Sequence, residues 1–145
     1  MINTKLRRYA GGLTLVEVLV VVVAILAAIV IPHLVDAADL TRENSLRMNL
    51  HQIRMQLEIY REHHDKFPSL GGLEAQLTDA SDADGDTAAP GTPGYPFGPY
   101  LLTVPNNPNS GGNTIGDGDV GSSDWYYDQG TGDFRANDSQ ETREY

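Results

Sequence analysis

The sequence predicts an α+β protein: one long N-terminal α-helix packed on a small C-terminal domain with a short helix and an antiparallel β-hairpin or small sheet. Three observations predict it. The apolar run GGLTLVEVLVVVVAILAAIVIP, from Gly11 to Pro32, is followed by an amphipathic segment with a helical period. Further on, glycine and proline become frequent, and two aromatic segments flank a glycine-rich turn, a pattern typical of a hairpin.

Composition narrows the class of protein. The chain has 145 residues, no cysteine and a formal net charge of −10, so it has neither a disulfide framework nor a thiolate metal site. Residues 67–134 contain ten acids and no Lys or Arg, whereas Lys5, Arg7 and Arg8 are the only charges among the first eight residues. This distribution argues against a nucleic-acid partner and favours a basic cytoplasmic end, an apolar segment and an acidic exported part.

The apolar run contains one acid, Glu17. The stretch from Val18 to Ile31 is uncharged, and with its neighbours it approaches the roughly 20 residues that span a bilayer. It is open to three interpretations: a retained signal anchor, a secretory signal cleaved before Ala38, or a signal cleaved between Gly12 and Leu13. The first two leave Glu17 unexplained, although an acid inside a membrane segment is usually functional. After cleavage at Leu13, the new α-amino group of a neighbouring subunit could pair with Glu17 in a filament.

The run Gly12-Leu13-Thr14-Leu15-Val16-Glu17, followed by an apolar helix, resembles the class III signal of type IV pilins and type II secretion pseudopilins. The resemblance implies that a prepilin peptidase cuts after Gly12 and N-methylates Leu13, and that Glu17 is needed for subunit assembly. The family most often has Phe where this chain has Leu13. Pro32 stands about two residues nearer the cleavage point than the proline common in the family.

The segment after Pro32 has one apolar helical face, formed by Leu46, Leu50, Ile53, Leu57 and Tyr60. Read continuously, the helix would run from Leu13 to His64, with a bend or local melting at Pro32. We expect the apolar face to pack on the following domain, and the helix to stop at Asp65-Lys66-Phe67-Pro68. Adjacent His63 and His64 point about 100° apart on a helix, so a solvated helix end is favoured over a metal site.

A second resemblance lies in the remainder of the chain. Tyr60, Phe67-Pro68-Ser69, Gly72 to Leu77 and Gly98 to Pro108 are similar to segments of the major pseudopilins. From the residues themselves, Leu70, Leu73 and Leu77 predict a short second helix. Trp125-Tyr126-Tyr127 and Phe134-Arg135-Ala136 predict a β-hairpin across the turn at 128–133.

Two acidic, glycine-rich loops raise the question of a metal. Asp82-Ala83-Asp84-Gly85-Asp86 begins like a calcium loop but lacks its later glycine and acid. Asp117, Asp119 and Asp124 offer hard oxygen ligands, and the resemblance to major pseudopilins implies a calcium ion in the C-terminal loops. No cofactor is certain; calcium is the candidate, with solvated mobile loops as the alternative.

No catalytic motif emerges from the sequence, so an enzyme is not expected. The preferred function is that of a structural subunit of a periplasmic type II secretion pseudopilus, anchored in a bacterial inner membrane with its N-terminus cytoplasmic. The resemblance implies three kinds of partner: other copies of the chain, a prepilin peptidase, and an assembly platform with minor pseudopilins. The alternatives are a type IV or competence-type pilin and a membrane-anchored periplasmic domain that does not polymerise.

Four parts are therefore expected along the chain. They are a leader peptide at 1–12, a hydrophobic transmembrane and filament-core helix at 13–35, an amphipathic helix at 36–66 and a small acidic globular domain at 67–145.

Overall fold

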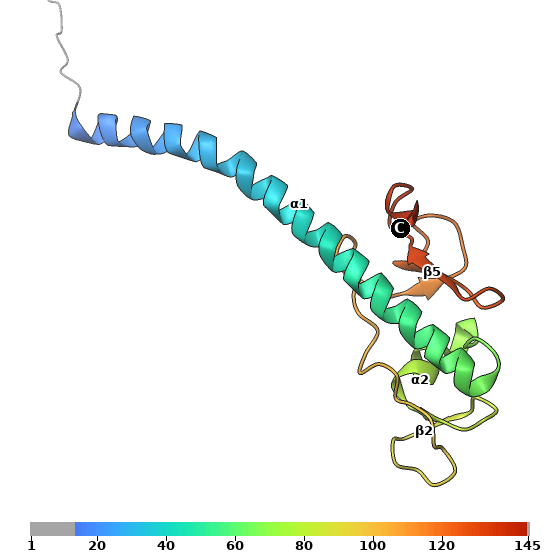
Figure 1. Cartoon of the computed structure of the whole chain (residues 1–145). Coiled ribbons are helices and arrows are strands. Elements are labelled where there is room, and N and C mark those ends of the chain that lie inside the picture. Colours follow the sequence, from blue (N-terminus) through green and yellow to red (C-terminus); the bar gives the residue numbers. More distant parts are fainter. Residues whose placement is uncertain (1–13, 145) are drawn as a thin grey trace, which may run out of the picture. The chain divides into compact units, whose positions relative to one another are not determined.

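The computed structural model describes residues 14–144, apart from the side chains of residues 29–36. The chain divides into two units, residues 1–39 and 40–145, and the boundary falls within helix α1, Leu15–His64 (Figure 1). The described part of the first unit is helical from Leu15 onward, whereas the second contains the remainder of α1 and all the other described elements. The fold class is therefore α+β, as predicted.

The second unit combines short helices with two small sheets. Strands β1 and β2 form an antiparallel ribbon, and a separate three-stranded sheet has the order β3-β4-β5, with β3 parallel and β5 antiparallel to β4. The elements after α1 are the 3-10 turn η1 (Leu70–Gly72), α2 (Leu73–Thr78), β1 (Ala80–Ser81), β2 (Thr87–Ala88), β3 (Ile115–Gly116), β4 (Trp125–Asp128), β5 (Asp133–Ala136) and the 3-10 turn η2 (Thr142–Glu144).

Strands β4 and β5 form the predicted hairpin. Trp125 pairs with Ala136 and Tyr127 with Phe134, and these four side chains are buried. Tyr126, between the two buried aromatic residues of β4, is only half-buried. Because successive side chains of a strand point to opposite faces, this alternation places one aromatic face of the hairpin in the core.

The core of the second unit is built on α1. The predicted face of the helix is buried, with every member 1% exposed or less, and α2 and β5 lie alongside this part of α1 (Figure 1). Each fully buried side chain of this size contributes about 1.5–3 kcal/mol relative to an exposed one. The core residues are Leu46, Leu50, Ile53, Leu57, Tyr60, Leu73, Leu77, Leu101, Val104, Trp125, Tyr127, Phe134 and Ala136. The expectation that this half of the helix packs on the following domain is confirmed.

Helix α1 ends where the sequence predicts. His64 is its last residue, Asp65 has a left-handed backbone (φ 53°), and Pro68 prevents the helix from resuming at once. The helical backbone continues across Pro32, so the local melting considered there does not occur. A bend at Pro32 stays a prediction.

Candidate functional site

Glu17 closes a hydrogen-bonded cap on the first turn of α1. Its Oε2 accepts from the backbone N–H of Thr14 at 2.7 Å and from the Thr14 hydroxyl at 2.9 Å, while the Glu17 N–H donates to Thr14 Oγ1 at 3.2 Å. This reciprocal pair is a capping box, which satisfies backbone donors that a helix start leaves free. Glu17 thus has a role within a single chain, which the spacing of Thr14 and Glu17 could have revealed. Thr14 brings no positive charge, so the cap does not neutralise the carboxylate.

Between Leu15 and Leu26, helix α1 exposes apolar side chains in every direction. Their exposed fractions range from 47% for Val22 to 83% for Leu15, in a helix that has no polar face over this stretch. Helices that are apolar all round are normally covered by lipid or by other protein. Taking only the residues whose side chains are described, no helix is both long enough and apolar enough to cross a membrane.

The predicted processing site precedes the described residues. Gly12 and Leu13 lie outside them, as does the side chain of Pro32. Cleavage after Gly12 and methylation of Leu13 therefore stay predictions, and the described chain begins with the capping residue that would follow them.

The end of α1 carries a histidine–tyrosine cluster rather than a solvated terminus. His64 is only 7% exposed: its ring stacks on Tyr60, with centroids 4.0 Å apart, and its Nε2 lies 3.1 Å from Tyr100 Oη and 3.2 Å from Ser81 Oγ. The same Tyr100 hydroxyl lies 3.0 Å from Nδ1 of His63. The prediction of a solvated end is wrong for His64, because residues far along the chain fold over it.

Burial dominates the electrostatics of this cluster. It lowers the pKa of His64, an effect that the nearby charges of His63 and Lys66 reinforce, while the carbonyl of Ala83 and the charge of Asp82 oppose it. Burial also raises the pKa of Tyr60 to about 12, with smaller contributions from Tyr100 and Asp82. Both rings are therefore favoured in their uncharged forms, which fits a structural role at this helix end.

The three acids predicted as calcium ligands are not gathered into one set. Among the residues whose side chains the structure describes, no three His, Asp or Glu side chains lie together as metal ligands would. Asp124 Oδ2 instead accepts from the N–H of Thr114 at 2.8 Å and from its hydroxyl at 2.6 Å. Hydrogen bonds from Ser110 and Thr114 lower the pKa of Asp124. Calcium binding by Asp117, Asp119 and Asp124 stays a prediction that requires this loop to rearrange.

One buried oxygen nearby lacks a donor. Asn137 is fully buried, and its Nδ2 donates to the carbonyl of Asp119 and to Ser123 Oγ, each at 3.0 Å, but its Oδ1 has no hydrogen-bond partner. An amide oxygen is a ligand that calcium accepts. Asn137, which follows β5 and contacts this loop, thus provides one oxygen without a hydrogen-bond donor, but not the carboxylate set that the sequence suggested.

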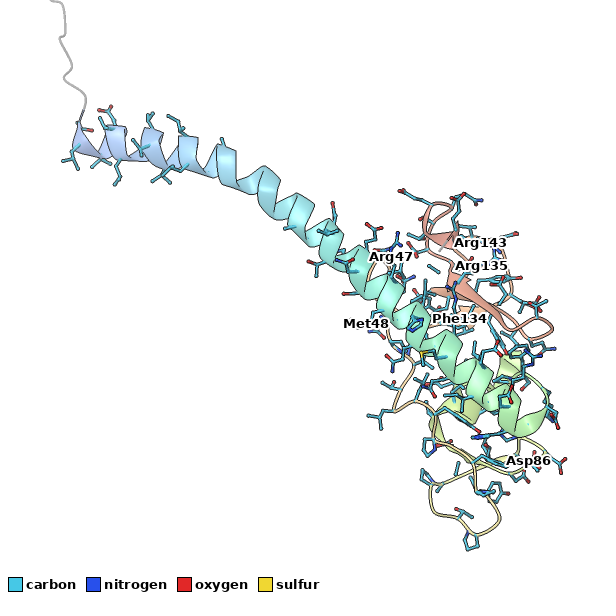
Figure 2. All side chains as sticks on the ribbon, viewed as in Figure 1. Arg47, Met48, Asp86, Phe134, Arg135 and Arg143 are labelled. Carbon is cyan, nitrogen blue, oxygen red and sulfur yellow. The ribbon has the colours of Figure 1, made fainter. Side chains whose placement is uncertain are left out.

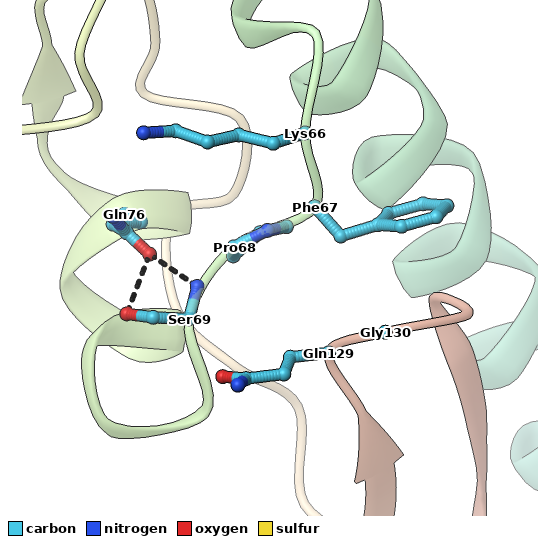
Figure 3. Close-up of a pocket in the computed structure, with 7 residues that line it drawn as sticks. All are labelled: Lys66, Phe67, Pro68, Ser69, Gln76, Gln129 and Gly130. Atoms are coloured by element: carbon cyan, nitrogen blue, oxygen red, sulfur yellow. Dashed lines mark hydrogen bonds between the residues drawn. The ribbon is translucent and has the colours of Figure 1, made fainter.

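A shallow hollow of about 330 Å³ lies between the segment after α1, helix α2 and the β4–β5 turn (Figure 3). Gln76 Oε1 accepts from the N–H of Ser69 at 2.8 Å and from its hydroxyl at 3.2 Å, and Gln129 Oε1 accepts from the N–H of Leu70 at 2.9 Å. Lys66 donates to the carbonyl of Asp84 at 2.6 Å. Because these polar groups already bind one another, the hollow is a packing seam between elements.

Comparison of the chain with family models, curated proteins and solved structures found no match. The geometry of the chain itself must therefore support any functional conclusion, together with the motif resemblances. In that geometry, the prominent feature is a capped, apolar and solvent-exposed helical segment, Leu15 to Leu26, followed along the chain by a compact acidic unit.

Proposed function

We propose that this protein is a structural filament subunit: a pseudopilin of a type II secretion system, processed by a prepilin peptidase and polymerised through its N-terminal helix to drive protein export. Its helix leaves a bacterial inner membrane when subunits assemble, and its acidic unit faces the periplasm. Its partners are other copies of the chain, an assembly platform and minor pseudopilins.

The observation that best supports this proposal is that helix α1 has two different parts, one buried in the second unit and one with exposed apolar side chains. Residues 46–60 of the helix are committed to the core of the second unit, where their apolar face is buried. Between Leu15 and Leu26, the same helix leaves its apolar side chains uncovered on all sides. Packing among copies covers such a segment in a filament, and lipid covers it beforehand.

The polar start of α1 supports the same proposal. The Thr14–Glu17 cap presents a carboxylate at the beginning of an otherwise apolar surface. In a staggered array of copies, the α-amino group created at Leu13 of one subunit supplies the positive charge that Thr14 does not. The cap within the chain and the charge pair between chains are thus separate roles of Glu17.

A pair of substitutions separates these two roles. Glu17→Gln retains an oxygen that can accept from Thr14 and keeps the capping box, but it removes the negative charge. Thr14→Ala removes the hydroxyl partner of the cap and keeps the charge. We expect the full-length Gln variant to be inserted and processed but to form no sedimentable filament, whereas the Thr14→Ala variant still assembles.

If Glu17→Gln assembled and Thr14→Ala did not, Glu17 would act only as a helix cap. If Glu17→Gln assembled as well as the unaltered chain, the proposed pairing with a neighbouring amine would be wrong. Long filaments on the surface of wild-type cells in electron micrographs would favour a type IV or competence-type pilin over a secretion pseudopilin. Failure of the unaltered chain to sediment as filaments would favour an anchored periplasmic domain.

A further inference from the structure

The last turn of α1 brings two imidazole nitrogens to one phenol oxygen. Nδ1 of His63 lies 3.0 Å from Tyr100 Oη, and Nε2 of His64 lies 3.1 Å from the same atom. Ser81 Oγ lies 3.2 Å from Nε2 of His64. Adjacent helical side chains point about 100° apart, yet the Tyr100 hydroxyl contacts both rings. We call His63, His64, Ser81 and Tyr100 the donor cluster.

The carbonyl of Ala83 selects the tautomer of His64. Nδ1 of His64 lies 3.4 Å from the Ala83 oxygen, which can only accept a hydrogen bond. In the uncharged ring, Nδ1 therefore carries the proton and Nε2 presents its lone pair to the donor cluster. Burial favours this uncharged ring, because it lowers the pKa of His64. Histidines that bind a metal ion usually have this arrangement, with one N–H on a carbonyl and the other nitrogen on the ion.

Backbone hydrogen bonds hold the two hydroxyl donors in place. The N–H of Ser81 donates to the carbonyl of Phe97 at 2.9 Å, and the N–H of Phe97 donates to the carbonyl of Ser81 at 3.1 Å. The N–H of Tyr100 donates to the carbonyl of Leu77 at 2.8 Å. The loop after β1, which includes Asp86, lies beside the same end of α1 (Figure 2). Ligands held by such supporting bonds need little further ordering to bind an ion.

Aromatic rings surround the donor cluster on its protein side. Tyr60 stacks on His64 with centroids 4.0 Å apart, and Phe97 stacks on His63 with centroids 4.9 Å apart. His64 and Ser81 are buried, whereas His63 is exposed. An ion can therefore reach the cluster from solvent at His63, and the apolar rings limit the access of water to the rest of it.

The charge of the second unit favours a cation. Residues 40–145 contain seven Lys and Arg and seventeen Asp and Glu, a net charge of −10. Such an excess raises the local concentration of positive ions. Close to the cluster, the charge of Asp82 favours a positive charge at His64, whereas Lys66 opposes it. The attraction therefore comes from the unit as a whole.

We propose that the donor cluster binds one zinc ion, Zn²⁺. Imidazole nitrogen is a ligand that zinc, copper and nickel prefer, whereas calcium and magnesium prefer sets made of oxygen alone. The ligands are Nδ1 of His63, Nε2 of His64 and Tyr100 Oη, with Ser81 Oγ as the fourth. The ion replaces the phenol proton of Tyr100, which passes to solvent.

The distances in the donor cluster are compatible with this ion after one movement. Neighbouring ligand atoms of a tetrahedral zinc ion lie about 3.3 Å apart, and the nitrogen–oxygen contacts of the cluster are 3.0, 3.1 and 3.2 Å long. The ring centroids of His63 and His64 are 6.5 Å apart. Two imidazoles on one tetrahedral zinc ion are closer, so the His63 ring must approach by about 1 Å. Its exposed position on the last helical turn allows this movement.

The zinc ion ties three separate segments together: the end of α1, strand β1 and the loop that carries Tyr100. The chain has no cysteine, and small domains without disulfides often use a metal ion for this purpose. One chain provides all four ligands, so this inference goes beyond the proposed function and does not depend on filament assembly.

Calorimetric titration of the full-length chain with Zn²⁺ tests the proposal. The protein is purified in detergent without a histidine tag and stripped of metal. We expect one Zn²⁺ per chain, and His63→Gln should lower the affinity at least about tenfold. The matched variant His51→Gln, at another exposed histidine of α1, should leave the affinity unchanged. Zinc should raise the melting temperature of the unaltered chain and of His51→Gln, but not of His63→Gln.

Three results of this titration would overturn the proposal. They are an absence of zinc binding, equal affinities in the two histidine variants, and displacement of Zn²⁺ by an equal concentration of Ca²⁺. Because His63 and His51 are both exposed, neither variant should change the melting temperature in the absence of metal.

Copper in place of zinc tests the role of Tyr100. A phenolate bound to Cu²⁺ gives a charge-transfer band in the visible spectrum, which should appear in the unaltered chain and in Tyr126→Phe but disappear in Tyr100→Phe. If the band were absent from the unaltered chain or persisted in Tyr100→Phe, the assignment of Tyr100 as a ligand would be wrong. Filaments built from chains that bind no zinc would refute the zinc site alone, whereas zinc binding by chains that never assemble would refute only the filament.

Discussion

Gly85 and Gly91 provide a matched test of how the loop after β1 packs on α1. Both have φ of +86°, but a Cβ built on Gly85 would lie 2.6 Å from Tyr60 Oη, whereas one on Gly91 would meet nothing within 4 Å. Alanine at either position therefore has the same backbone strain, and only at Gly85 does it also meet a buried side chain. We predict that Gly85→Ala is clearly more destabilising than Gly91→Ala.

The magnitude follows from the two contributions. A left-handed backbone costs an L-residue about 1–2 kcal/mol, which applies to both variants. Overpacking of a well-packed site adds about 1–3 kcal/mol, which applies to Gly85→Ala alone. For a unit of this size, each kcal/mol lowers the melting temperature by roughly 4–8 °C. Thermal unfolding of the full chain in detergent, followed by circular dichroism, measures both variants under one condition.

Tyr60→Phe completes the test as a double-mutant cycle. Tyr60 Oη is buried without a hydrogen-bond partner in the described structure, so its removal should change the free energy of unfolding little. In the Tyr60→Phe background, the extra cost of Gly85→Ala should largely disappear, while that of Gly91→Ala should not change. Equal melting temperatures for Gly85→Ala and Gly91→Ala would refute the close approach of this loop to Tyr60.

Three further predictions concern other parts of the second unit. Tyr127 is buried, and its hydroxyl donates to the carbonyl of Pro68 at 2.8 Å. Tyr127→Phe should therefore lower the free energy of unfolding, measured by urea titration, by about 1–3 kcal/mol. If Tyr127→Phe lowered it no more than Tyr126→Phe, at a half-buried tyrosine, this hydrogen bond would be contradicted. Because the folded pKa of His64 lies below its ordinary value, the unfolded chain binds more protons, and melting temperature should fall as pH drops below about 7. The dependence of melting temperature on pH should be weaker in the His64→Phe variant. If that variant and the unaltered protein had the same pH profile, His64 would not be its source. If Asp117, Asp119 and Asp124 bind calcium, millimolar Ca²⁺ should raise the melting temperature and a chelator reverse it; a melting temperature that ignores both would count against the site.

Local periodicity was sufficient to predict the elements built from nearby residues. The apolar face from Leu46 to Tyr60, the short helix containing Leu73 and Leu77, and the hairpin at Trp125 were all predicted from spacing. In each case, the spacing of apolar residues within the segment indicates both the type of element and which of its faces is buried, so the element can be predicted from the sequence.

Features that depend on distant residues could not be predicted in this way. The burial of His64 requires Tyr100 and Ser81, which follow it by 36 and 17 positions. The parallel pairing of β3 with β4 and the dispersal of the expected calcium ligands also depend on how loops fold back. The Thr14–Glu17 cap is different, because its spacing is local and was open to prediction.

Assembly of this protein into a filament requires a new α-amino group close to Glu17, and the intact mass of the protein extracted from membranes shows whether that group has been created. We predict a chain that begins at Leu13 and carries one added methyl group. A chain that begins at Met1 or at Ala38 would contradict it.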